Sequence, residues 1–136
     1  MIVALICSVV FYDQVENIAN ELRTNGHEVI YPGVYNEMSI AETARRHGGN
    51  ALVKFKQQMY ELSEKNIKKS DAVLAINLDK DGRKNYIGGS TFLELYEAYR
   101  NHKKIYLWND IPDSNLRDEI EGFEPIVVRG DVSKIV

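Results

Sequence analysis

Apolar runs alternate with amphipathic stretches from the start of the chain. Ile2–Val9 is apolar apart from Ser8, and this continuity is typical of a strand buried on both faces of a parallel sheet. In Phe11–Asn25 the apolar residues recur at helical spacing, and Gly26 provides the expected helix end. His27–Tyr31 is the next predicted strand. Residues 2–31 therefore predict a βαβ unit.

The rest of the chain continues this alternation. Further helices are predicted at 51–69, 89–101 and 115–121, and further strands at 72–78, 104–108 and 124–128. We expect an α/β fold: a three-layer α-β-α sandwich of flavodoxin or Rossmann-like type, with a five-stranded parallel sheet in the order 2-1-3-4-5. Because no repeat or linker interrupts the pattern, residues 1–136 are expected to form a single domain.

The composition excludes several classes of protein. Hydrophobic residues make up 44% and charged residues 27% of the 136 residues, as in ordinary globular domains. The net charge is -3 and no basic block is present, so nucleic-acid binding is not expected. No apolar run approaches the ~18 residues of a membrane span. With a single cysteine, Cys7, and no signal-peptide pattern, we expect a cytoplasmic protein that has no disulfide and binds no membrane.

The predicted topology places a ligand site. Ligands of open parallel sheets bind beyond the carboxyl ends of the strands, at the point where the strand order reverses. Here that point lies between the first and third strands, where residues 7–12, 33–50 and 78–91 are expected to converge. The irregular stretch 35–49, with a helical turn predicted at 39–46 and a Gly48-Gly49 hinge, is a candidate lid.

The stretch Gly88-Gly89-Ser90-Thr91 combines two glycines with two hydroxyl residues, directly before a predicted helix. Glycine permits close approach of backbone N–H groups to an anion, and a helix N-terminus adds free donors and partial positive charge. The simpler explanation is a turn that needs glycine. The position of residues 88–91 after the central strand nevertheless favours binding of a phosphate or a sugar.

Other loop residues are weaker candidates for substrate contact. Ser8 follows the first strand and is a candidate phosphate contact, although a structural role is the favoured explanation. Tyr12 and Tyr86 stand at loop edges, where an aromatic ring can stack on a nucleobase or simply pack against the protein.

Glu94 has two interpretations. Thr91-Phe92-Leu93-Glu94 matches a capping box, in which Thr91 would be the N-cap and Glu94 would accept from its N–H. Alternatively, a glutamate in this position is a carboxylate nucleophile or base at the mouth of the cleft. Such a carboxylate can attack the anomeric carbon of a sugar and form a covalent intermediate.

No metal or cofactor site is predicted. The segment 77–82 superficially resembles the start of a calcium loop, but Gly88 occupies the twelfth position, where a glutamate is needed. The histidines are dispersed, and the chain lacks both a dinucleotide-binding glycine fingerprint and a phosphate-loop lysine.

Residues 70–108 resemble the nucleoside 2-deoxyribosyltransferase family, with a looser match over 1–33. The resemblance rests on Ser70-Asp71-Ala72-Val73-Leu74 and on Thr91-Phe92-Leu93-Glu94-Leu95. It implies a nucleoside or nucleotide substrate, Glu94 as the nucleophile on C1 of the sugar, and a homo-oligomer. A shorter match, through Gly88, Gly89, Thr91 and Glu94, resembles the nucleoside-monophosphate phosphoribohydrolases of the lysine-decarboxylase-like family.

The chain departs from the deoxyribosyltransferase pattern at one informative position. Family members commonly carry an aspartate near the helix start that helps to protonate the departing base, and Gly88 stands there in this chain. Asp79, Asp81 and Asn85 are the candidate replacements. The expected function is transfer or hydrolysis of an N-glycosidic bond through Glu94, and the alternative is a non-catalytic nucleotide-binding or sensing module.

Overall fold

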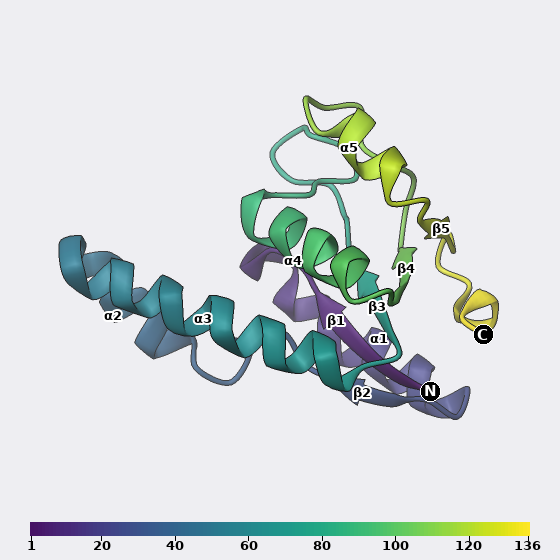
Figure 1. Cartoon of the computed structure of the whole chain (residues 1–136), viewed down its shortest axis with the longest axis horizontal. Coiled ribbons are helices and arrows are strands. Elements are labelled where there is room, and N and C mark those ends of the chain that lie inside the picture. The colour runs from purple at the N-terminus through teal and green to yellow at the C-terminus, as the bar shows by residue number, and fades with distance from the viewer.

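The computed structural model describes residues 1–136 and contains one five-stranded parallel sheet (Figure 1). The strands follow the order β2-β1-β3-β4-β5, and every neighbouring pair is parallel. The predicted fold class and strand order are confirmed. The strands are β1 (Ile2–Ile6), β2 (Glu28–Ile30), β3 (Ala72–Ala75), β4 (Lys104–Leu107) and β5 (Ile126–Val127).

Helices cover both faces of the sheet. One face carries α1 together with a short C-terminal 3-10 helix, and the other carries α3, α4 and α5. None of the helices combines the length and the apolar character needed to cross a membrane. The helices are α1 (Tyr12–Thr24), α2 (Met38–His47), α3 (Gly49–Lys69), α4 (Gly89–Arg100) and α5 (Arg117–Gly122), with 3-10 turns at Val9–Phe11 and Val132–Lys134.

The two hydrophobic cores share the central strands. In β1, Val3 and Leu5 belong to the core under α1, whereas Ala4 and Ile6 belong to the core under α4. All four residues of β3 are buried in the same alternating way. Because the central strands are covered on both faces, their sequences are continuously apolar, which is why the pattern predicted them correctly.

The third strand leaves the sheet earlier than predicted. The strand β3 ends at Ala75, one last backbone bond joins the Ile76 N–H to the Ile6 carbonyl at 2.9 Å, and the chain stays buried as far as Asn77. The side chain of Asn77 then bonds to the segment after β4: its Nδ2 donates to the carbonyls of Asn109 and Asp110 at 3.1 and 3.0 Å. Its Oδ1 accepts from the Asn109 N–H at 2.8 Å. A buried amide thus replaces backbone pairing beyond the strand ends.

The region predicted as irregular is instead mostly helical. A full helix, α2, replaces the single turn predicted at 39–46. Gly48 and Gly49 connect α2 to α3 with φ values of 61° and 51°, a conformation that glycine adopts without strain. The resulting α2–α3 hairpin extends well beyond the edge of the sheet (Figure 1).

Candidate active site

A cavity of about 440 Å³ opens beyond the carboxyl ends of β1 and β3. The predicted convergence of loops is observed, because the walls include Ser8 and Tyr12 after β1, Pro32–Val34 after β2, and Gly88–Thr91 at the start of α4. Helix α3 supplies a further wall that the sequence did not predict. The cavity therefore lies at the topological switch point of the sheet.

The first turn of α4 faces this cavity. Gly88 is the residue before the helix, and its carbonyl accepts from the Phe92 N–H at 2.9 Å. The N–H groups of Gly89, Ser90 and Thr91 precede this first helical bond, so they have no partner within the helix. Three free donors and the positive end of the helix dipole thus meet the cavity, an arrangement that suits an anion.

Glu94 does not form the capping box that the sequence allowed. Thr91 is the third residue of α4 rather than its N-cap, and it is buried. The Glu94 carboxylate accepts from the Ser63 hydroxyl of α3 at 3.1 Å. The capping interpretation is therefore wrong, and this carboxylate lines the cavity instead.

The environment of Glu94 raises the pKa of its carboxyl group. Burial raises the pKa of this carboxyl from 4.5 to about 7, against the opposing effects of the Ser63 hydrogen bond and the Lys56 charge. No other carboxylate lines the cavity. The cavity therefore holds one carboxyl group that gains and loses its proton near neutral pH, as expected of a catalytic acid, base or nucleophile.

Cys7 and Tyr12 lie close to Glu94 in the cavity wall. Burial, reinforced by the Glu94 charge, raises the pKa of the Cys7 thiol to about 12. Burial and the nearby Cys7 and Glu94 also raise the pKa of Tyr12, although the Val34 N–H opposes the shift. Both groups therefore keep their protons at neutral pH, and Glu94 is the group that ionises.

Three cationic side chains line the same cavity: Arg45 of α2, Lys56 of α3 and Lys80 of the loop before α4. None of the three forms an ion pair with a carboxylate of the protein. The Lys56 ammonium donates to the Ser90 hydroxyl at 3.0 Å, which places it at the start of α4. The cavity thus holds more positive than negative side chains and suits an anionic ligand.

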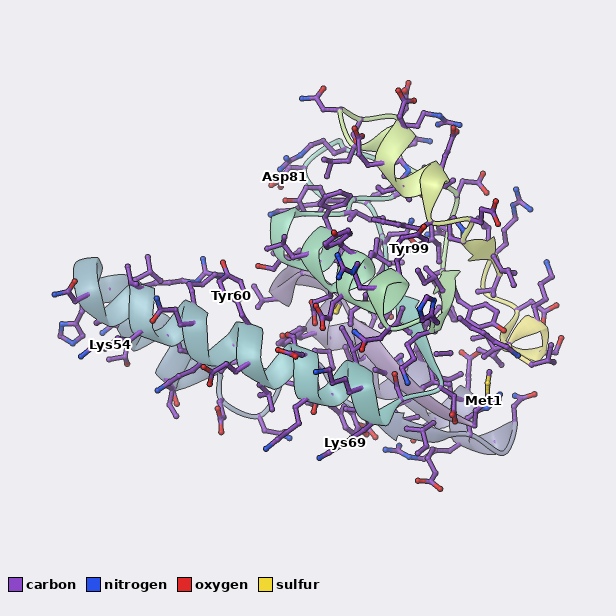
Figure 2. All side chains as sticks on the ribbon, viewed as in Figure 1. Met1, Lys54, Tyr60, Lys69, Asp81 and Tyr99 are labelled. Carbon is purple, nitrogen blue, oxygen red and sulfur yellow. The ribbon has the colours of Figure 1, made fainter.

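The structure does not bring Asp79, Asp81 or Asn85 to Glu94. None of the three lines the cavity. The Asp79 carboxylate accepts from the Asn85 N–H at 3.1 Å and so closes the loop on itself. Figure 2 shows Asp81 on the outer loop near the start of α4, away from the body of α3. A structural role in the loop accounts for Asp79.

The cavity does bring together most of the residues that the sequence singled out. Those that line it are Ser8, Tyr12, Tyr86, Gly88, Gly89, Ser90, Thr91 and Glu94. The residues that the sequence did not indicate are Arg45, Lys56, Ser63 and Lys80. The sequence did contain one indication of this wall: Lys56, Met59 and Ser63 have the i, i+3, i+7 spacing that places side chains on one face of a helix. That stripe carries polar residues beside the apolar ones, which marks a wall rather than a core.

A second hollow of about 310 Å³ lies between α3 and α4; we call it the α3–α4 groove. Glu94 and Ser63 line it as well as the cavity, so the carboxylate lies between the two hollows. Tyr60, Leu93 and Tyr96 also line the groove and are 49%, 48% and 45% exposed. Three large apolar side chains are therefore exposed at the rim of the site, among polar and charged neighbours.

Comparison with known proteins establishes the fold. No protein-family model matches the chain, and no curated protein matches its sequence. Among solved structures, the chain is similar to one described as the CMP N-glycosidase BcmB of Clostridium botulinum, with a TM-score of 0.58 and 16% sequence identity. The match covers 99% of this chain and 98% of that one. The likeness shows that the two proteins share an α/β fold over nearly their whole length.

Proposed function

We propose that the chain is a nucleotide N-glycosidase that uses Glu94 as its nucleophile. The observation that carries this proposal is the Glu94 carboxylate itself, which is held by Ser63 in the cavity and has a pKa of about 7. This carboxylate performs no capping or ion-pairing role that would explain its burial. Glu94 is partly buried, and its carboxyl is desolvated enough to raise its pKa. A carboxylate perturbed in this way in a cavity, without a structural role, indicates function.

In the proposed reaction, Glu94 attacks C1 of the sugar from the side opposite the base. The C1–N bond breaks, its electron pair leaves with the base, and a glycosyl ester forms on Glu94. Water then attacks C1, releases the sugar phosphate and restores the carboxylate. Tyr12 and Tyr86 are the proposed contacts of the base, and Ser8 together with Gly88–Thr91 the proposed contacts of the sugar and phosphate.

The charges of the cavity favour a nucleotide over a nucleoside. Arg45, Lys56 and Lys80 line the same cavity as one carboxylate, and the residues with free N–H groups at the start of α4 line it too. A phosphate group would satisfy these donors, whereas an uncharged nucleoside would leave them unpaired. The fold shared with a protein described as a CMP N-glycosidase supports the same substrate class.

Base release from nucleotides tests the proposal directly. The purified protein is incubated with nucleoside 5′-monophosphates and the corresponding nucleosides, with and without a second base as acceptor, and products are separated by chromatography. We expect free base and sugar phosphate from at least one monophosphate, and slower release from its nucleoside. Thermal stabilisation by a nucleotide without base release would favour the binding-only alternative and contradict the enzyme.

Removing a cavity cation is expected to impair recognition of the phosphate. Lys56→Met and Arg45→Met should each lower kcat/KM for the monophosphate about tenfold to a hundredfold, since a hydrogen bond to a charged group contributes about 1.5–3 kcal/mol. The rate with the nucleoside should change much less. Steady-state kinetics on both substrates measure the difference.

Matched controls for these variants lie on the same two helices as the cations. Arg46 follows Arg45 on α2, and Lys65 lies on α3; both are exposed and neither lines the cavity. Arg46→Met and Lys65→Met remove the same charges from elsewhere and should leave kcat/KM unchanged. An equal loss in variants and controls would show that net charge, rather than contact with phosphate, is responsible.

The α3–α4 groove is the proposed interface of a homodimer. Tyr60, Leu93 and Tyr96 form an exposed apolar patch whose borders carry both Lys56 and Glu64. A patch with charges of both signs can pair with a copy of itself across a two-fold axis. Tyr60 lies near the middle of α3 and is about half exposed (Figure 2). Pairing would also cover the groove side of Glu94.

Light scattering after size-exclusion chromatography tests the dimer. We expect a species with twice the 15.6 kDa mass of the chain. Leu93→Glu should shift it to the monomer at micromolar concentration, because each interface would then bury two unpaired charges. Ile126→Glu, at a similarly exposed apolar residue outside the patch, is the control. A wild type that runs as a monomer at all concentrations would disprove the interface.

A further inference from the structure

The hydroxyl of Tyr86 occupies the space of the side chain that Gly88 lacks. The backbone of Gly88 is in an extended conformation, φ -88° and ψ -178°, which any residue adopts. A Cβ atom at this position would nevertheless lie 2.8 Å from the Tyr86 hydroxyl oxygen and 3.2 Å from two ring carbons. Glycine is therefore required at residue 88 because Tyr86 fills the adjoining space.

Tyr86 is held firmly at its backbone and ring. Its N–H donates to the Leu78 carbonyl at 2.8 Å, and the ring centroid lies 4.6 Å from the Lys80 ammonium and 4.6 Å from the Arg83 guanidinium. Lys80 and Arg83 are themselves joined by two backbone hydrogen bonds of 2.9 Å. The ring is thus fixed by a closed loop and by two cations.

The hydroxyl of Tyr86, in contrast, is free. It makes no hydrogen bond to any group of the protein, and the residue lines the cavity beside the start of α4. Tyr12, the other tyrosine in the wall, also makes no hydrogen bond through its hydroxyl, but burial, Cys7 and Glu94 raise its pKa and make it a weaker proton donor. Tyr86 therefore presents a fixed, unpaired proton donor to the same cavity as the nucleophile.

We propose that Tyr86 is the general acid of the reaction proposed above, donating its proton to the departing base. As Glu94 forms its bond to C1, the C1–N electron pair moves into the base and the base takes the proton of the Tyr86 hydroxyl. The two cations at the ring offset the negative charge left on the phenolate. In the second step the attacking water gives its proton to this oxygen, and the glycosyl ester opens to restore Glu94. The sum is nucleotide plus water giving base plus sugar phosphate.

The proposal explains how the chain manages without an acid at residue 88. Asp79 and Asp81 stand outside the cavity, and the Cys7 thiol lies in the wall beside the nucleophile. Tyrosine is an accepted general acid, and such a group contributes about 10²–10⁴-fold to a rate. This inference rests on the proposed N-glycosidase activity. It assigns the donation of a proton to the departing base, which Glu94 cannot provide while it acts as the nucleophile.

The test uses Tyr86→Phe, which keeps the ring and removes only the hydroxyl. With the nucleoside monophosphate that the wild type cleaves, kcat should fall about 10²-fold or more while KM changes less than about threefold. Nicotinamide mononucleotide provides the second probe, because its cationic base departs neutral and needs no proton. The variant should cleave it at nearly the wild-type rate. Tyr99→Phe, an exposed tyrosine of α4 outside the cavity, is the control.

A second variant moves the hydroxyl without removing it. Gly88→Ala places a methyl group against the end of the Tyr86 side chain and should reproduce the loss in kcat. A kcat of Tyr86→Phe within about threefold of the wild type, or an equal loss on both probes, would overturn the role of Tyr86 and leave the N-glycosidase standing. No base release from any monophosphate by the wild type would overturn the N-glycosidase itself.

Discussion

Glu94→Gln is expected to lower base release from nucleotides by about 10³-fold or more, the largest effect of any substitution in this chain. The amide keeps the size of the side chain and can still accept from Ser63, but it cannot form the glycosyl ester. In the wild type, kcat/KM should rise with pH up to about 7, because burial holds the pKa of Glu94 there and only the carboxylate attacks. Initial rates between pH 5 and pH 9 measure both effects.

The control for this variant is Glu61→Gln on α3. Glu61 is exposed and lines neither the cavity nor the α3–α4 groove, so its replacement should leave the rate unchanged. Residual activity of Glu94→Gln above about a tenth of the wild type would exclude the covalent mechanism. Wild-type activity that falls as the pH rises to 7 would show that Glu94 acts in its protonated form.

The same substitution should stabilise the protein at alkaline pH. The pKa of Glu94 is about 7 in the folded protein against an ordinary 4.5, so the folded state holds a proton that the unfolded chain loses between these values. Stability contributed by this group therefore falls as the pH rises from 4.5 to 7 and stays reduced above 7. Glutamine has no proton to lose, and Glu94→Gln should gain about 2–3 kcal/mol at pH 8.

Denaturant unfolding of both proteins at pH 8 and pH 5 measures this gain. We expect the difference in unfolding free energy to shrink steeply at pH 5, where the carboxyl is protonated in the folded protein and resembles the amide. Glu61→Gln serves again as the control and should leave the unfolding free energy nearly unchanged at both pH values. A variant less stable than the wild type at pH 8 would mean that the Glu94 charge is well solvated or paired.

Nearly all of the fold could be predicted because its signals are local in sequence. The continuous burial of β1 and β3, the stripe of α1 and the cap at Gly26 follow from spacing that any single sequence displays. Strand ends were overestimated because apolar residues continue past the last backbone pair. Beyond Ala75 the chain remains buried while Asn77 takes over the bonding through its side chain. Hydropathy does not distinguish a buried segment that is paired in the sheet from one that is bonded through a side chain.

The site was predicted only in part, for a different reason. Residues 88–94 are adjacent in sequence, so their combination was visible. Lys56, Ser63 and Arg45 reach the cavity from helices that are separated from α4 by most of a strand and a loop. The capping box failed because a motif of spacing says nothing about the start of the helix, which lies at Gly89. Only the three-dimensional contact with Ser63 reveals which partner Glu94 has.

The cations proposed to bind the phosphate and the groups proposed to break the glycosidic bond lie in different segments of the chain. Residues 38–69 supply Arg45 and Lys56, whereas Glu94 and Tyr86 lie in the segment between β3 and the first turns of α4. The two helices of the α2–α3 hairpin meet at Gly48-Gly49, the hairpin extends beyond the edge of the sheet, and it supplies no strand to the sheet. Substrate preference can therefore diverge through changes within residues 38–56, while Ser63 and Ile67 further along α3 keep their contacts with Glu94 and with the core of the sheet. The outer part of this hairpin is thus a natural unit for grafting new selectivity.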